Sequence, residues 1–229
     1  MSAPVELAAG LWRWATRHPE WHPGRFGAEI ACFALAAGDE LLLVDPLLPE
    51  DDDAPVLEAL DRLARGRSVH VLITIGYHAR SGEPLAERYD GGLWGPRNVA
   101  ARLRDTSRLR ELEPGAPGPG GATAYAIGRP RRSERPLWLP SHRAIAFGDA
   151  VVSTPEGELR MWCHEEIDER RARFYRERFA PTLSPLAELP VEHVLVTHGE
   201  PVLEHGAAAL RTALASRPWK PVSRATAAG

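Results

Sequence analysis

The sequence has only two cysteines, Cys32 and Cys163, among its 229 residues. Two cysteines exclude both a disulfide framework and a cysteine-rich metal site. No apolar run approaches the roughly 18 residues that a membrane-spanning helix needs. The first residues also lack a basic stretch followed by a long apolar one, so they do not resemble a signal peptide. We therefore expect a cytoplasmic protein without a membrane partner.

The chain also lacks an excess of charge of either sign. It has 28 Lys and Arg against 31 Asp and Glu, a formal net charge of -3. This balance argues against a nucleic-acid partner, which would favour a basic surface. With 44% apolar and 26% charged residues the composition is that of a globular protein. We expect a small-molecule ligand or substrate, while the sequence leaves self-association open.

Apolar runs and turn residues predict an alternation of strands and helices. Strands are expected at residues 29–38, 40–46, 69–74, 143–152 and 193–197, and helices at 49–66, 83–89, 165–189 and 204–216. The run at 69–74 has no polar alternation, which predicts a strand buried on both faces. We interpret residues 1–229 as one domain with a Trp-rich segment at 1–28 and a flexible tail at 217–229.

Polar side chains stand at the ends of four of these apolar strands. Asp45 ends "LLLVDP", Asp149 follows "AIAFG", and His198 follows "HVLVT". The fourth strand runs into "TIGYHAR", residues 74–80, a loop rich in polar side chains. In an α/β sandwich such strand ends converge on one edge, where ligands commonly bind. The sequence therefore predicts a site at this edge.

These four pieces, in this order, resemble the metallo-β-lactamase superfamily over about residues 29–215. The resemblance implies an α/β fold, the αββα sandwich, with its site at one edge of two facing sheets. It also implies hydrolysis by a hydroxide held on one or two zinc ions.

The chain departs from the family's metal-binding motif, Thr-His-x-His-x-Asp-His. In "TIGYHAR" the four ligand positions hold Ile75, Tyr77, Ala79 and Arg80. Residues 128–143, where a further ligand histidine is expected, hold none at a suitable place. Only Asp149 and His198 carry over as ligands, with Asp45 as a supporting residue. A zinc site needs three or four protein ligands, so we expect no cofactor; if zinc does bind, His78, Asp149 and His198 are the predicted ligands.

A metal-free site follows as a hypothesis. The Arg80 guanidinium, a permanent cation that binds carboxylates as a fork, would replace zinc and pair with Asp149. His198 would complete the cluster with Asp149 or Tyr77. The candidate catalytic residues are Tyr77, His78, Arg80, Asp149 and His198.

Plainer interpretations apply to several of these positions. His78 is also explained as an exposed loop histidine, and Asp45 as a turn that ends a strand. Tyr77 is also explained as a cover over the space of the missing metals. Three tryptophans near the N-terminus would line a substrate entrance or pack as a flap over the sheet edge: Trp12, Trp14 and Trp21.

Three functions remain open on the sequence. The first is a metal-independent or metal-poor enzyme of hydrolase or lyase type. His198 would act as general acid or base and would be oriented by Asp149. Arg80 or His78 would bind an anionic group of the substrate. Cleavage of an ester, lactone or thioester fits this chemistry, and so does elimination or isomerisation; no serine or cysteine stands in a nucleophile elbow. The second is a pseudoenzyme that binds a small molecule or a partner chain. The third is a zinc hydrolase with displaced ligands.

Overall fold

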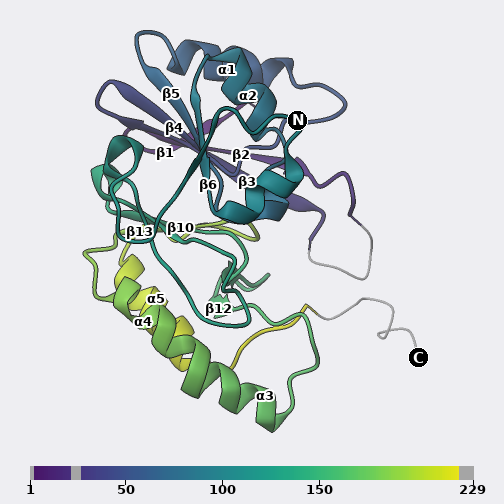
Figure 1. Ribbon diagram of the computed structural model, residues 1–229. Coiled ribbons are helices and arrows are strands. Elements are labelled where there is room, and N and C mark those ends of the chain that lie inside the picture. Colours follow the sequence, from purple (N-terminus) through teal and green to yellow (C-terminus); the bar gives the residue numbers. More distant parts are fainter. Residues whose placement is uncertain (1–2, 22–26, 222–229) are drawn as a thin grey trace.

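The computed structural model describes residues 3–21 and 27–221. Two facing β-sheets form its centre, and helices cover the outer face of each (Figure 1). The large sheet has α1 and α2 on its outer side, and the small sheet has α3, α4 and α5. This is the αββα sandwich that the sequence predicts.

The large sheet has seven strands in chain order, β1 to β7. The first four pair antiparallel, and β4 to β7 pair parallel. Its strands are β1 (Val5–Ala8), β2 (Leu11–Arg17), β3 (Glu29–Ala37), β4 (Glu40–Val44), β5 (Ser68–Leu72), β6 (Gly92–Gly95) and β7 (Leu109–Glu111).

The small sheet has the order β13-β10-β9-β8, and a separate two-stranded ribbon follows β10. Because β10 and β13 are parallel, their carboxyl ends lie together. The strands are β8 (Thr123–Ala124), β9 (Leu137–Leu139), β10 (Ala144–Phe147) and β13 (His193–Val196), and the ribbon is β11 (Val151–Ser153) with β12 (Leu159–Met161). The run at 143–152, expected as one strand, is divided because the chain turns at Gly148 and Asp149.

The two-sided burial of the central strands explains their lack of polar alternation. In β3, Ile30 and Cys32 pack towards α1 and α2, whereas Ala31 and Phe33 pack against the small sheet. Residues of β4, β10 and β13 divide between two apolar layers in the same way. A strand between two apolar layers needs apolar side chains at every position.

The helices are α1 (Ala54–Leu63), α2 (Gly82–Arg88), α3 (Glu169–Phe174), α4 (Ala180–Ala187) and α5 (Gly206–Ala215). A π-helical stretch, Tyr175–Phe179, joins α3 to α4, so the expected long helix at 165–189 begins later and changes pitch. Short 3-10 stretches occur at Gly76–His78, Arg97–Arg102, Pro119–Gly121 and Pro140–His142. None of the helices in the described ranges is both long and apolar enough to cross a bilayer.

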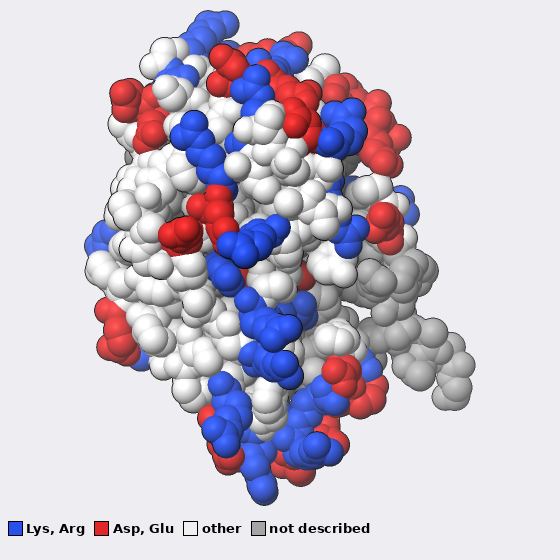
Figure 2. Space-filling view, in the orientation of Figure 1, with Lys and Arg blue, Asp and Glu red and all other residues white. Residues whose placement is uncertain are grey.

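The exposed side of α3 carries charges of both signs. Asp168 caps its first turn by accepting a hydrogen bond from the Arg171 amide at 2.7 Å. Arg171 also pairs with Glu165. Figure 2 shows basic and acidic side chains mixed at this lower end of the molecule. Such interleaving is typical of a solvated helix face.

The structure describes part of each terminal segment. The Trp-rich segment contains β1 and β2, which extend the large sheet, and Trp14 is buried in the core with its indole Nε1 donating to the Leu47 carbonyl at 2.9 Å. Trp14 is therefore a core residue and lines no entrance. In the tail predicted to be flexible, Trp219 pairs through its backbone with Met161 and Cys163. The remainder of that tail, 222–229, lies outside the described residues.

Candidate active site at the carboxyl ends of the strands

The four strand ends meet as predicted, and their polar side chains form one buried cluster. Asp45 follows β4, Thr74 follows β5, Asp149 follows β10 and His198 follows β13. All four are at most 9% exposed. Gly148 permits the close approach, because a Cβ at this position would lie 2.6 Å from the Thr74 hydroxyl oxygen.

Asp45 organises the loop after β5. Its Oδ1 accepts the Thr74 amide at 2.7 Å, and its Oδ2 accepts the Thr74 hydroxyl at 2.5 Å and faces His78 Nδ1 at 2.8 Å. The Asp45 backbone is left-handed, with φ 47°, which aspartate tolerates better than most residues. Asp45 is therefore more than a strand-ending turn, since it fixes the position of His78 across 33 residues of sequence.

His78 is buried, so its interpretation as an exposed loop histidine is wrong. Its Nδ1 faces Asp45, and its Nε2 lies 3.6 Å from Asp149 Oδ1. Burial and the charge of Arg80 lower the pKa of His78, but the two carboxylates raise it more, so the net shift is upward. A histidine with one carboxylate at each ring nitrogen is stable as the imidazolium cation.

Asp149 is the centre of the cluster. Its Oδ1 lies 3.5 Å from His198 Nε2 and 3.6 Å from His78 Nε2, and its Oδ2 lies 3.5 Å from Arg131 Nη1. Burial opposes ionisation, but the neighbouring His198 and His78 rings hold the pKa of Asp149 well below its usual range. Asp149 is therefore a carboxylate that faces two histidine rings and a guanidinium, although its Oδ1 accepts no hydrogen bond of good geometry from the described residues.

The pKa of His198 is shifted in the opposite direction to that of His78. Burial lowers it most, and Asp149 only partly opposes this shift. A neutral imidazole has one donor nitrogen and one basic nitrogen, so a neutral His198 can act as a base. The Trp162 ring packs edge-on against His198, with 5.8 Å between the ring centroids. The surroundings thus shift the pKa values of the two histidines apart, upward for His78 and downward for His198.

Arg131, and not Arg80, pairs with Asp149, so this part of the metal-free hypothesis is wrong. The Arg131 guanidinium also stacks on Trp162, 4.4 Å from the ring centroid. Arg131 comes from the stretch 128–143, in which the family resemblance leads one to expect a further histidine. No pattern in the sequence distinguishes Arg131 from the other arginines of this stretch.

Arg80 lies beside the cluster without joining it. Its charge interacts with Asp45 and Asp149, and burial lowers its pKa most. Among the described residues its Nε and Nη1 have no hydrogen-bond partner, although both atoms are buried. Its backbone is left-handed, with φ 35°, an unfavourable conformation for a long side chain. The fold therefore holds a buried guanidinium with unused donors next to the two histidines.

Tyr77 lies farther from the cluster than Arg80 and points to solvent. Its side chain is 69% exposed, and Arg102 stacks on its ring at 4.5 Å. It neither pairs with His198 nor covers the space of missing metals. Ile75, in contrast, is buried at 3% exposure.

Glu134 is a buried member of the site that the sequence analysis missed. It accepts the amides of Gly148 and Asp149 at 2.9 and 3.0 Å and is fully buried. Burial and the neighbouring charge of Asp149 raise the pKa of Glu134 to about 7. A glutamate within an arginine-rich, polar stretch gives no pattern that would predict its burial.

The residues present do not fit a zinc ion. His78 and His198 both direct Nε2 at the same oxygen of Asp149, and Arg131 brings a permanent positive charge to the other oxygen. No group of three or more His, Cys, Asp or Glu suited to holding a metal ion occurs within residues 3–21 and 27–221. Hydrogen-bond donors and a guanidinium thus stand where a metal would need free ligands.

Comparisons of the sequence with known proteins do not assign the chain to a family. No family model matches the chain. A probable dual-specificity RNA methyltransferase RlmN from Frankia casuarinae is 32% identical over 124 residues, which is 52% of this chain and 28% of that protein. The chain thus spans little more than a quarter of the curated relative that it matches.

The similar solved structures are metallo-β-lactamases. The enzyme from Pontibacter korlensis superposes with a TM-score of 0.65 at 12% identity, covering 93% of this chain and 99% of that one. The enzyme from Hirschia baltica gives 0.63 at 15%, with 93% and 95% covered. A β-lactamase domain protein from Burkholderia ambifaria gives 0.60 at 20%, with 93% and 70% covered. The chain is therefore a divergent protein with the metallo-β-lactamase fold.

Proposed function

We propose that the protein is a metal-independent enzyme of hydrolase type that acts on a small ester, lactone or thioester with an anionic group. One observation carries the proposal: the rings of His78 and His198 both face one oxygen of Asp149, and the Arg131 guanidinium faces the other. Neighbouring groups whose surroundings push their pKa values apart are a common signature of acid–base sites.

The proposed reaction uses His198 as the base. The neutral His198 ring takes a proton from water, and the water oxygen forms a bond to the carbonyl carbon of the substrate. His198 then returns that proton to the leaving oxygen or sulfur as the carbonyl-to-leaving-group bond breaks. Asp149 orients the ring and stabilises the imidazolium that forms.

Arg80 and His78 place positive charge close to His198, where it can stabilise the oxyanion that develops in the reaction. Arg80 has unused donors and is coupled to Asp149, and His78 is held as a cation between two carboxylates. A preorganised cation near the developing oxyanion lowers the barrier in a buried site. Arg80 is the proposed binding group for the anionic part of the substrate.

The test is a panel of small chromogenic esters, lactones and thioesters, assayed with a chelator present. We expect His198→Asn to lower kcat/KM by about 100-fold or more, while His164→Asn, a change at a 62% exposed side chain, leaves it unaltered. Equal rates for His198→Asn and the wild type would refute the role of His198. Loss of activity with chelator and its recovery with zinc would refute metal independence.

A second candidate function is a non-catalytic protein that binds a small molecule. The low exposure of Asp149 and His198, 8% and 9%, favours it, because a catalytic pair needs access to substrate. Saturable binding of a ligand with no turnover of any substrate class would support this candidate over the enzyme.

A further inference from the structure

A second polar cavity lies at the opposite edge of the large sheet. It has a volume of about 540 Å³ and is formed where β5, β6 and β7 begin and α2 ends. Polar strand ends such as Asp45 and Thr74 belong to the other edge, so this cavity is separate from the candidate active site. Its volume is in the range of small-molecule sites.

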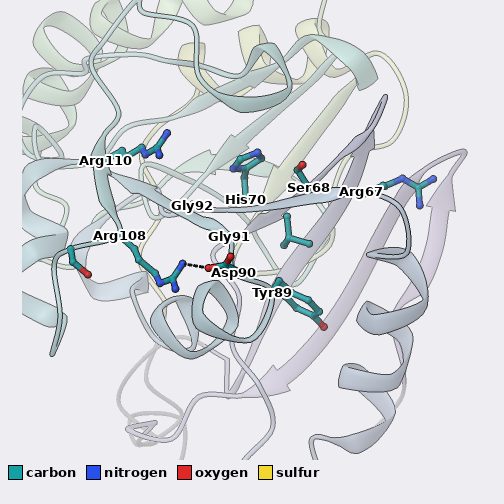
Figure 3. A pocket seen from close by; sticks show the side chains of 11 residues that line it. Arg67, Ser68, His70, Tyr89, Asp90, Gly91, Gly92, Arg108 and Arg110 are labelled. Carbon is teal, nitrogen blue, oxygen red and sulfur yellow. Dashed lines mark hydrogen bonds and ion pairs between the residues drawn. The ribbon is translucent and has the colours of Figure 1, made fainter.

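The cavity has a surplus of positive charge. Three arginines line it, Arg67, Arg108 and Arg110, against the single carboxylate of Asp90, which Arg108 already binds at 2.9 Å. Figure 3 shows Arg108 and Arg110 on one side and Arg67 on the other, with His70 and two glycines between them. Two positive charges of this lining therefore lack a compensating carboxylate in it.

Two hydrogen-bonding atoms without partners lie beside Gly92, which lines this cavity; one belongs to the lining residue His70 and the other to Trp94, just behind the lining. His70 Nδ1 and Trp94 Nε1 are buried and have no hydrogen-bond partner among the described residues. Both face Gly92, because a Cβ there would lie 3.1 Å from the first atom and 2.7 Å from the second. Arg67 Nε is buried and unpartnered as well, while its Nη1 donates to the Leu63 carbonyl at 2.7 Å. The indole N–H of Trp94 is a buried donor without a partner, which costs free energy that a bound acceptor recovers.

The same side chains are held in place by the fold. His70 Nε2 faces Glu40 Oε1 at 3.1 Å, and the Arg110 guanidinium stacks on Trp94, 5.3 Å from the ring centroid. The Trp94 and His70 rings meet edge-on. Donors fixed in this way lose little freedom when a ligand binds.

We propose that this cavity binds a phosphate group, as inorganic phosphate or as the phosphate of a small monoester. A phosphate carries a charge of about -1.5 to -2 at neutral pH, which balances the surplus of the lining. Its oxygens accept from arginine forks and from an indole N–H. No step of the proposed hydrolysis uses this cavity, so the two proposals stand independently.

The test is a titration of the full chain with inorganic phosphate and with glycerol 3-phosphate, followed by backbone amide NMR. We expect saturable shifts of Gly91 and Gly92 and none of Gly148 or His198. Tighter binding of the monoester would identify a metabolite site, and tighter binding of inorganic phosphate an ion site; both support the proposal. Shifts only at Gly148 and His198, or no shifts, would overturn it.

Single substitutions show which side chains contribute to phosphate binding. Arg110→Gln and Trp94→Phe should each weaken phosphate binding, the arginine change by about tenfold or more. Arg97→Gln is the matched control, because this arginine is 87% exposed, pairs with Glu111 and does not line the cavity. If Arg97→Gln weakens phosphate binding equally, the effect is general charge attraction and the proposed site is refuted. An unaltered amide spectrum confirms that each variant is folded.

Discussion

At the scale of single residues, Asp149 connects both histidines to Arg131 and is buried. A carboxylate in this position is stabilised only because donors surround it on both oxygens. The groups around Asp149 are themselves buried cations or polar rings, and each is stabilised by this carboxylate. The cluster is thus a mutually dependent set, in which removal of the central charge leaves the others unpaired.

We predict that Asp149→Asn lowers the free energy of unfolding by about 3 kcal/mol, because it leaves the His78 and Arg131 cations without their shared partner. Urea unfolding measures this change. Asp61→Asn, which breaks a half-exposed ion pair with Arg88, should cost about 1 kcal/mol or less. If Asp149→Asn lowers the free energy of unfolding no more than Asp61→Asn does, the buried cations do not depend on Asp149.

Glu134 gives a prediction for pH. Its pKa is raised from 4.5 to about 7 in the fold, so the folded state keeps a proton that the unfolded state has lost over this range. Folding is then favoured at low pH, and stability falls as pH rises from about 4.5 to 7. Glu134→Gln does not titrate and should lack this slope.

The measurement compares unfolding free energies of the wild type and Glu134→Gln between pH 5 and 8. We expect the wild type to lose roughly 2–3 kcal/mol relative to the variant across this range. Glu158→Gln, at a 58% exposed side chain, serves as the control. Parallel profiles of the wild type and Glu134→Gln would show that Glu134 ionises in the fold as it does in water.

At the scale of elements, β2 is anchored to the core by one side chain. Trp14 is 2% exposed, packs in the layer under α1 and α2, and donates to the Leu47 carbonyl after β4. It therefore ties the N-terminal hairpin, β1 and β2, to the loop that carries Asp45. The hairpin extends the sheet next to the site without supplying any residue of the cluster.

We predict that Trp14→Ala destabilises the fold by about 3–5 kcal/mol, since it leaves a large cavity and an unpaired carbonyl. Trp12→Ala, two residues away on the same strand and only partly buried, should cost clearly less. Thermal unfolding of the two variants tests this order. Similar losses for both would mean that Trp14 is not the anchor.

At the scale of the whole molecule, the metal question has a direct measurement. We predict that protein purified without a histidine tag after growth with added zinc carries well below one zinc per chain by elemental mass spectrometry. Added zinc should also leave Tm unchanged, because a ligand that binds the folded state would raise it. One or more zinc ions per chain would show that the site does bind zinc. His78, Asp149 and His198 would then be the predicted ligands.

The sequence by itself predicted that the central strands are buried on both faces and that polar strand ends meet at one edge. Runs such as Ile30–Phe33, without polar alternation, require an apolar layer on each face, and strand ends marked by Asp45, Asp149 and His198 indicate a common edge. Both are local patterns, readable over a few residues, and the structure confirms them.

Only the tertiary structure decided which side chains meet. The partner of Asp149 proved to be Arg131, the buried acid Glu134 and the buried state of His78 were not visible, and Tyr77 turned out to face solvent. The physical reason is that a polar residue is buried only where distant chain segments supply its partners, as Asp45 does for His78 across 33 residues. Hydropathy and spacing along the chain do not predict such pairs.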